Sequence, residues 1–152
     1  MPITIYLGAD HGGFPLKEQC KTWLQQQNYV VVDLGAATLD PDDDYPQYAI
    51  AVGREVASDS SRRGILFCRS GAGMAIAANK VVGIRAVAAH SVDEVKHARE
   101  HDDANVLTIA ADWLRAASVE ELLRAFLTTE GAVAPRHVRR IQQISEYELQ
   151  SE

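Results

Sequence analysis

Residues 64–89 read GILFCRSGAGMAIAANKVVGIRAVAA and contain the pattern that decides the fold. The run GILFC (64–68) is almost wholly apolar, the segment 72–80 has helical spacing, and IRAVAA (84–89) is again mostly apolar. Strands that are buried on both faces are near-continuous apolar runs, and parallel strands need a crossover connection between them, usually a helix. The stretch therefore predicts one strand-helix-strand unit of a parallel sheet.

The same alternation continues outward in both directions. Further strands are predicted at 3–9, 29–35 and 105–110, and further helices at 14–27, 47–58, 91–101, 118–128 and 136–149. This pattern predicts an α/β fold of the Rossmann-like class, a three-layer α/β/α sandwich with a five-stranded parallel sheet and right-handed crossovers. Residues 1–152 are expected to form a single domain that ends in an additional helix.

Composition narrows the classes of function. The 152 residues are 47% apolar and 24% charged, which is typical of globular proteins and excludes disordered, collagen-like and coiled-coil chains. A formal charge of −6 disfavours nucleic acid as a partner. Apolar runs such as 82–90 are shorter than the roughly 20 residues of a membrane span, and the first residues lack a signal-peptide pattern. We therefore expect a cytoplasmic protein with neither nucleic-acid nor membrane partners.

Polar side chains follow three of the predicted strands, at the carboxyl ends where open α/β sheets bind their ligands. Asp10 and His11 follow the first strand, Cys68 ends the third, and Asp112 follows the fifth. The turn at 71–73 presents backbone N–H groups that bind anions and stabilise a thiolate. Cys68 is a candidate base or nucleophile, or else a small apolar residue in a buried strand. Asp10 is a ligand for a sugar hydroxyl or a cap of its turn, and His11 is a candidate phosphate ligand.

Two segments resemble metal sites without completing them. His97, Glu100 and His101 match the zinc signature H-x-x-E-H, which needs a third ligand and a larger scaffold. We instead expect His97 to be a solvated helix residue and His101, at the helix end, to face the cleft as an acid or base. The acidic residues at 40–44 begin like a calcium loop, but Tyr45 stands where that loop requires glycine.

Arg136 and Arg140 lie one helical turn apart at the start of the last predicted helix. Two guanidinium groups on one stripe form a fork suited to a phosphate. The alternative is a solvated basic face.

Taken together, five segments resemble the type B ribose-5-phosphate isomerase family, which includes galactose- and allose-phosphate isomerases. They are GADHGG (8–13), DDDYPQYA (42–49), GILFCRSGAGMAIAANKVVGIRA (64–86), AREHDDANVL (98–107) and RHVRRI (136–141). The resemblance covers nearly the whole chain. It implies that a sugar phosphate is isomerised between aldose and ketose through an enediolate, without metal or cofactor. It also implies a homodimer or dimer of dimers whose active sites draw residues from both chains.

The resemblance assigns roles by position. It makes Cys68 the base that moves a proton between C1 and C2, and His101 the residue that opens the furanose ring. Ser70 is placed with these two as a catalytic residue that lines the site, and Tyr45 lines it as well. Asp10 binds the substrate hydroxyls, and the N–H groups of Gly71 and Gly73 bind the enediolate oxygen. The phosphate is bound by His11, Arg136 and Arg140.

Three positions depart from the pattern of this family. Arg69 stands where glycine is typical, Asp102 where asparagine is common, and Asp112 where an arginine often helps to bind phosphate. An aspartate at 112 repels phosphate, so Arg69 either pairs with it or replaces the missing arginine. We predict ribose 5-phosphate as the substrate, with tetrose or hexose phosphates as alternatives. A catalytically silent sugar-phosphate-binding module is the rival from another class.

Overall fold

Five parallel strands form the centre of the molecule in the order β2-β1-β3-β5-β4. The computed structural model describes residues 2–151. Within β3, residues pair in parallel register with β1 on one side and β5 on the other, and Cys68 lies beside Ala110. The strands are β1 (Thr4–Ala9), β2 (Val30–Asp33), β3 (Arg62–Cys68), β4 (Ala86–Ala88) and β5 (Val106–Ala110).

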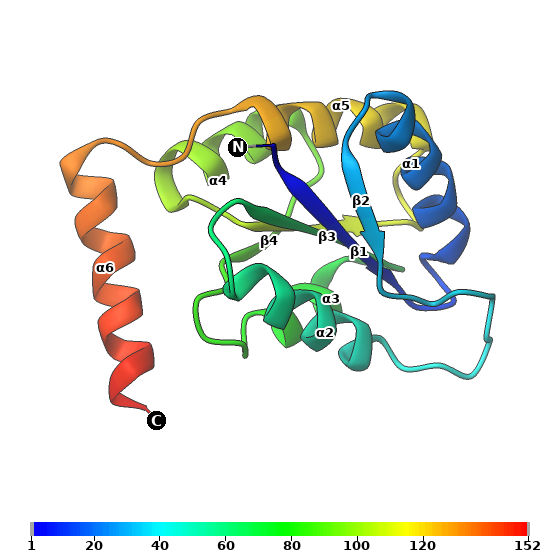
Figure 1. Cartoon of the computed structure of the whole chain (residues 1–152), viewed down its shortest axis with the longest axis horizontal. Helices are drawn as coiled ribbons and strands as arrows, with labels where there is room; N and C mark the ends of the chain where they lie inside the picture. Colours follow the sequence, from blue (N-terminus) through cyan, green and yellow to red (C-terminus); the bar gives the residue numbers. More distant parts are fainter. Residues whose placement is uncertain (1, 152) are drawn as a thin grey trace.

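Helices cover both faces of this sheet (Figure 1). Within residues 2–151 they are α1 (Phe14–Gln26), α2 (Tyr45–Ala57), α3 (Ala72–Ala78), α4 (Val92–Asp102), α5 (Ala116–Thr128) and α6 (Pro135–Gln150). Helices α1, α4 and α5 pack on one face, and α2 and α3 pack on the other. None of the helices in this part of the chain is long and apolar enough to cross a membrane.

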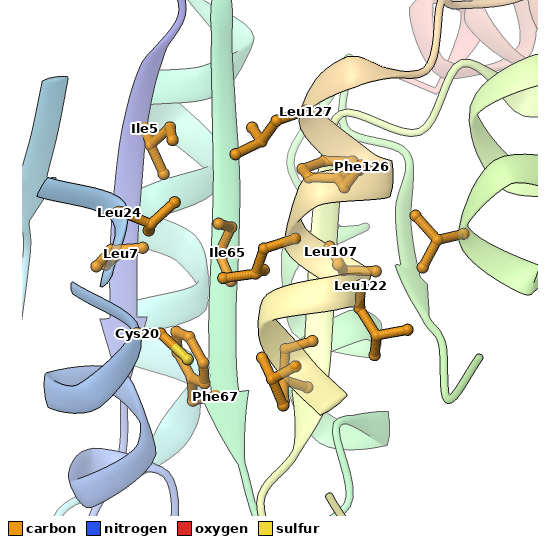
Figure 2. Packing of buried hydrophobic residues seen from close by; sticks show 14 of the residues in the cluster. Ile5, Leu7, Cys20, Leu24, Ile65, Phe67, Leu107, Leu122, Phe126 and Leu127 are labelled. Atoms are coloured by element: carbon orange, nitrogen blue, oxygen red, sulfur yellow. The ribbon is translucent and has the colours of Figure 1, made fainter. Parts of the chain in front are cut away.

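Alternation along β3 divides the core into two layers, because successive side chains of a strand point to opposite faces. Ile65 and Phe67 point toward α1 and α5, where Figure 2 shows them among the buried side chains of that layer. Leu66 and Cys68 point to the α2–α3 side. Burial of each large apolar side chain stabilises the fold by about 1.5–3 kcal/mol. The same alternation turns the Cys68 thiol toward the loops that precede α2 and α3.

The predicted three-layer α/β/α fold is confirmed, with small shifts at the ends of elements. Strand β3 begins two residues before its apolar run, because Arg62 and Arg63 still pair with β1. Helix α2 begins at Tyr45 rather than 47, because Pro46 is well suited to the first turn of a helix. Strand β4 is shorter than the predicted run 84–89.

Helix α6 packs against α4 and stands apart from the sheet (Figure 1). Its end is fixed by Glu148, whose Oε2 accepts a hydrogen bond of 3.0 Å from the N–H of Gly83. Several of its apolar side chains are exposed, namely Val138, Ile144, Tyr147 and Leu149. The helix therefore presents an uncovered, partly apolar surface.

The connections of the chain reverse direction between β1 and β3. From β1 the chain crosses outward to β2, and from β2 it returns across β1 to β3 on the other side. Ligands of open α/β sheets bind at such a point, outside the carboxyl ends of the two strands. Asp10 directly follows β1, and Cys68 is the last residue of β3.

Candidate active site

A cavity of about 350 Å³ lies at the carboxyl ends of β1 and β3. This volume falls within the roughly 300–1,000 Å³ range of small-molecule sites. Its wall is formed by seven of the residues singled out in the sequence, which are Asp10, His11, Tyr45, Cys68, Arg69, Ser70 and Gly73.

Cys68 stands at the base of the turn that leads into α3. The N–H of Gly71 donates a hydrogen bond to Cys68 Sγ at 3.1 Å. Gly71 adopts the left-handed region, with φ of 76°, which glycine enters without steric cost. Its carbonyl oxygen accepts a 2.7 Å hydrogen bond from the Thr108 hydroxyl on β5. The turn is therefore held from two sides, and the thiol has a fixed position beside backbone N–H groups.

Tyr45 and Ser70 complete the wall on either side of the thiol. The Tyr45 ring packs so closely on Gly73 that a Cβ at that glycine would lie 2.7 Å from the ring carbon Cζ. The Ser70 hydroxyl accepts a hydrogen bond of 3.2 Å from the N–H of Ala72. Gly73 is thus required for close packing, and the Ser70 hydroxyl is bonded to the first residue of α3.

Asp10 and His11 form the β1 side of the cavity. Asp10 Oδ1 accepts a 3.1 Å hydrogen bond from the N–H of Gly13, so this side chain caps its turn while it lines the cavity. His11 is held by Asp43, whose Oδ1 lies 2.9 Å from both the backbone nitrogen and Nδ1 of His11. Asp10 can therefore cap its turn and still face a ligand in the cavity, so the two roles considered for it do not exclude each other.

Asp43 was not identified from the sequence as a site residue. Its side chain is 1% exposed, and its Oδ2 accepts a 3.0 Å hydrogen bond from the Tyr48 hydroxyl. Burial favours the neutral acid, but hydrogen bonds from His11 and Tyr48 outweigh burial and lower the pKa of Asp43. Asp43 in turn raises the pKa of His11, with a smaller contribution from Asp10 that Arg69 opposes. Asp43 therefore favours the charged imidazolium form of His11, which attracts anions more strongly than the neutral form.

Arg69 and Asp112 form an ion pair at the mouth of the cavity. Arg69 Nε lies 3.4 Å from Asp112 Oδ2, and the two side chains are 70% and 47% exposed. The N–H of Asp112 also donates to the carbonyl oxygen of Arg69 at 3.0 Å. Of the two roles left open for Arg69, the structure shows the pairing with Asp112.

His101 lies near the amino ends of the strands, on the opposite side of the sheet from the cavity, whose wall is at the carboxyl ends. Helix α4 starts after β4 with a capping box between Ser91 and Glu94, then runs back toward the amino end of β5. His101 is in its last turn, before Asp103 closes the helix in the left-handed region. The cavity wall formed by residues 2–151 includes neither His101 nor Asp102. His101 was expected to face the cleft, and within a single chain it does not line this cavity.

A second group of predicted site residues surrounds His101. Its ring stacks on His97 at a centroid distance of 3.8 Å and on His137 of α6 at 4.1 Å. Burial lowers the pKa of His101, and the two neighbouring histidines lower it further. Arg136 Nε lies 3.3 Å from His137 Nε2, and Arg140 follows one turn later on the exposed side of α6. Within residues 2–151, no group of three or more His, Cys, Asp or Glu side chains is placed to hold a metal ion.

One chain therefore carries two groups of predicted site residues, one at the carboxyl ends of the strands and one at their amino ends. We call these groups the thiol half-site and the imidazole half-site. The thiol half-site contains Cys68 and its cavity, and the imidazole half-site contains His101 with the arginines of α6. Figure 1 shows β1 starting on the side of the molecule where α6 stands and ending on the other. A thiol, a carboxylate and a histidine whose pKa is raised surround one small cavity, an arrangement that fits a sugar-phosphate isomerase.

Comparison with known proteins agrees with this class. The family model described as Ribose/Galactose Isomerase matches residues 5–144. Ribose-5-phosphate isomerase B of Mycolicibacterium paratuberculosis is 42% identical over 146 residues, which cover 96% of this chain and 92% of the relative. The chain belongs to the ribose/galactose isomerase family.

Solved structures of this family superpose closely. Ribose-5-phosphate isomerase B of Clostridium thermocellum gives a TM-score of 0.94 at 33% identity, covering 99% of this chain and 100% of that one. The isomerase B of Mycoplasma genitalium, with bound ribulose-5-phosphate, gives 0.93 at 36% identity and covers 97% of each chain. The family resemblance recognised in the five sequence segments is thereby confirmed.

Proposed function

We propose that the protein interconverts ribose 5-phosphate and ribulose 5-phosphate. The observation that carries this proposal is the match to the Mycoplasma genitalium structure, which holds ribulose-5-phosphate and superposes over 97% of this chain with a TM-score of 0.93. The cavity at the ends of β1 and β3 supports it, because a thiol lies there beside Asp10 and backbone N–H groups.

In the proposed reaction, Cys68 as thiolate removes the proton from C2 of the open-chain aldose. The C–H electrons form the C1–C2 double bond while the C1=O electrons move onto O1, which gives the enediolate. The ketose forms when the O2 proton is transferred to O1 and Cys68 returns its proton to C1, which regenerates the thiolate. The N–H groups of Gly71 and Gly73 stabilise the oxygen on which negative charge develops, where preorganised dipoles contribute most.

The remaining residues bind and prepare the sugar. Asp10 accepts hydrogen bonds from substrate hydroxyls, and protonated His11 binds the phosphate with Arg136 and Arg140. His101 opens the furanose ring. The low pKa of His101 supports this role, because a neutral imidazole can accept the proton of the anomeric hydroxyl.

The separation of the two half-sites supports a shared active site in a homodimer. A two-fold axis brings the thiol half-site of one copy to the imidazole half-site of the other and completes two sites at once. The exposed apolar side chains of α6, Ile144 and Tyr147 among them, are available for burial against a second copy.

Mixed dimers test this arrangement and the activity together. Cys68→Ala and His101→Ala chains are each expected to be nearly inactive alone. When they are unfolded together in equal amounts and refolded, half of the dimers contain one chain of each kind. Each mixed dimer has one intact site, so about one quarter of the native activity should return. If the mixture stays as inactive as its components, the shared site is wrong.

The substrate is tested with a panel of four- to six-carbon aldose phosphates, by following ketose formation. Ribose 5-phosphate should be turned over fastest. Incubation in heavy water separates catalysis from silent binding, because an isomerase incorporates deuterium at C2 of recovered substrate. Saturable binding without exchange or turnover would instead support the silent binding module.

A further inference from the structure

A separate cavity, of about 210 Å³, lies at the amino ends of the strands, opposite the thiol half-site. Arg62 and Arg63 at the start of β3 line it, together with Arg85 before β4 and Asn105 before β5. Its volume is below the roughly 300–1,000 Å³ of typical cofactor and drug-sized ligand sites. The cavity is therefore suited to a small ligand.

Among the residues that line this cavity, three arginines stand against one carboxylate, that of Asp103. Arg62 Nη1 lies 2.7 Å from Glu55 Oε2. Arg85 and Arg99 share a single carboxylate, with Arg85 Nη2 3.3 Å from Asp103 Oδ2 and Arg99 Nη1 2.7 Å from Asp103 Oδ1. Two carboxylates thus pair with three guanidinium groups before Arg63 is considered. Glu148 bonds to the N–H of the lining residue Gly83, and Asp59 lies near Arg62, but neither forms an ion pair with these arginines.

Arg63 adds a fourth positive charge with no carboxylate partner. Its Nη1 donates to two backbone carbonyl oxygens, at 2.9 and 2.8 Å. Among residues 2–151, no carboxylate forms an ion pair with its guanidinium. Burial lowers the pKa of Arg63, and Arg99 and Arg85 lower it further against the opposing effect of Asp103. A half-buried guanidinium among like charges is unfavourable unless an anion accompanies it.

The free part of this guanidinium is accessible to a ligand. Arg63 lines the cavity, and its Nε and Nη2 make no hydrogen bond within the described part of the chain. No buried side-chain nitrogen or oxygen in that part lacks a partner, so these two atoms reach solvent. The planar edge of an arginine binds phosphate with two parallel hydrogen bonds.

We propose that this cavity is a second anion site, which binds a phosphate group through Arg63 with Arg62 and Arg85 beside it. Nothing in the proposed isomerase reaction uses these three residues, which lie at the other edge of the sheet. The phosphate group belongs to the free inorganic ion or to a small phosphomonoester, because the cavity is too small for a nucleotide.

Calorimetric titration with inorganic phosphate, at constant ionic strength in chloride, tests the site. The titration is run on the native chain and on Arg140→Ala, which weakens the separate phosphate clamp of the proposed active site. In both backgrounds Arg63→Gln should lower the affinity of one binding event at least tenfold. Arg54→Gln, which removes the same charge from an exposed position on α2, should leave it within twofold. Equal losses in the two variants, or no loss in Arg63→Gln, would overturn the proposal.

A second variant keeps the test decisive if Arg63→Gln does not fold. Ser60 lines the cavity, and its carbonyl oxygen accepts one of the Arg63 hydrogen bonds. Ser60→Asp places a carboxylate beside Arg63, so it should raise the melting temperature in chloride and abolish phosphate binding at this site. Unchanged phosphate binding in Ser60→Asp contradicts the proposal.

Parallel titrations with glycerol 3-phosphate identify the source of the anion. Binding of both ligands supports a phosphomonoester site, binding of inorganic phosphate alone supports a site for the free ion, and binding of neither overturns the proposal. Because Arg140→Ala reports on the active-site clamp separately, failure of this site and failure of the proposed isomerase function give different results.

Discussion

Replacement of Cys68 by alanine is the sharpest test of the proposed chemistry. Among the side chains of the cavity, Asp10 caps a turn and His11 is bonded to Asp43, whereas the Cys68 sulfur accepts one hydrogen bond from Gly71. These contacts leave the thiol free for the role we propose for it, the exchange of a proton with substrate carbon. Loss of a general base lowers a rate by about 10²–10⁴-fold, which corresponds to about 2.7–5.4 kcal/mol of activation free energy.

The structural cost of the same change is much smaller. Cys68→Ala removes one sulfur atom and one hydrogen bond, and a neutral hydrogen bond contributes about 0.5–1.5 kcal/mol to stability. Cys68→Ser retains a hydrogen-bond acceptor for Gly71 but replaces the thiol with a far weaker acid. Both variants should fold and bind substrate, and both should lose kcat for ketose formation and deuterium exchange at C2.

Cys20 provides the matched control. It is buried in α1 on the opposite face of the sheet, and burial raises the pKa of its thiol to about 12. Cys20→Ala should leave kcat unchanged, and thiol alkylation of the native protein should inactivate it through Cys68, with substrate protecting. A Cys68→Ala variant whose kcat lies within threefold of the native value would refute the assignment of Cys68 as base.

Three further predictions concern phosphate binding. In the native protein, KM measured between about pH 5 and 8 should rise as pH increases through the raised pKa of His11. Asp43→Asn removes the main cause of that raised pKa, so it should move the rise in KM to lower pH. An unmoved profile contradicts the role of Asp43. Arg140→Ala should raise KM for a phosphorylated sugar about tenfold or more while the unphosphorylated sugar is unaffected. Arg69→Gly leaves Asp112 unpaired, so it should raise KM, and adding Asp112→Arg should restore it non-additively; unchanged KM in Arg69→Gly makes Arg69 a bystander.

The His11–Asp43 and Arg69–Asp112 pairs also contribute to the stability of the fold. His11 has a raised pKa in the folded chain, so its interaction with Asp43 stabilises the fold fully below the unfolded pKa and is lost as pH rises through the folded one. The ion pair between Arg69 and Asp112 is largely exposed, and such pairs contribute about 0–1 kcal/mol. Arg69→Gly should therefore change KM without a comparable change in melting temperature, which separates binding from stability.

The fold was predictable because its signal is local and repeated. Each strand is an apolar run, each helix has its own spacing, and the carboxyl ends of parallel strands lie at one edge whatever the strand order. Asp10 and Cys68 could therefore be placed in one cavity from the sequence. The order of the strands, with β5 between β3 and β4, has no such local signature and required the structure.

The residues that hold the site in place were harder to find. In the run DDDYP nothing distinguishes Asp43 from its acidic neighbours, yet Asp43 alone of the three is buried. Lys17 is fully buried in α1, where Nζ binds both carboxylate oxygens of Asp33 at 2.8 Å and the carbonyl of Ala36. Contacts of this kind depend on segments far apart in the chain, and helical periodicity assigns a lysine to the surface by default.

The position of His101, in contrast, follows from topology that the sequence already predicts. In a parallel β/α unit the helix returns the chain from the carboxyl edge of the sheet to the amino edge, so a residue in its last turn lies far from the strand ends that bind ligand. A histidine at the end of the fourth helix therefore cannot reach the cavity of Cys68 without reversing that helix. If both residues act on one sugar, the second must come from another copy of the chain, and the mixed-dimer experiment follows from the direction of a single helix.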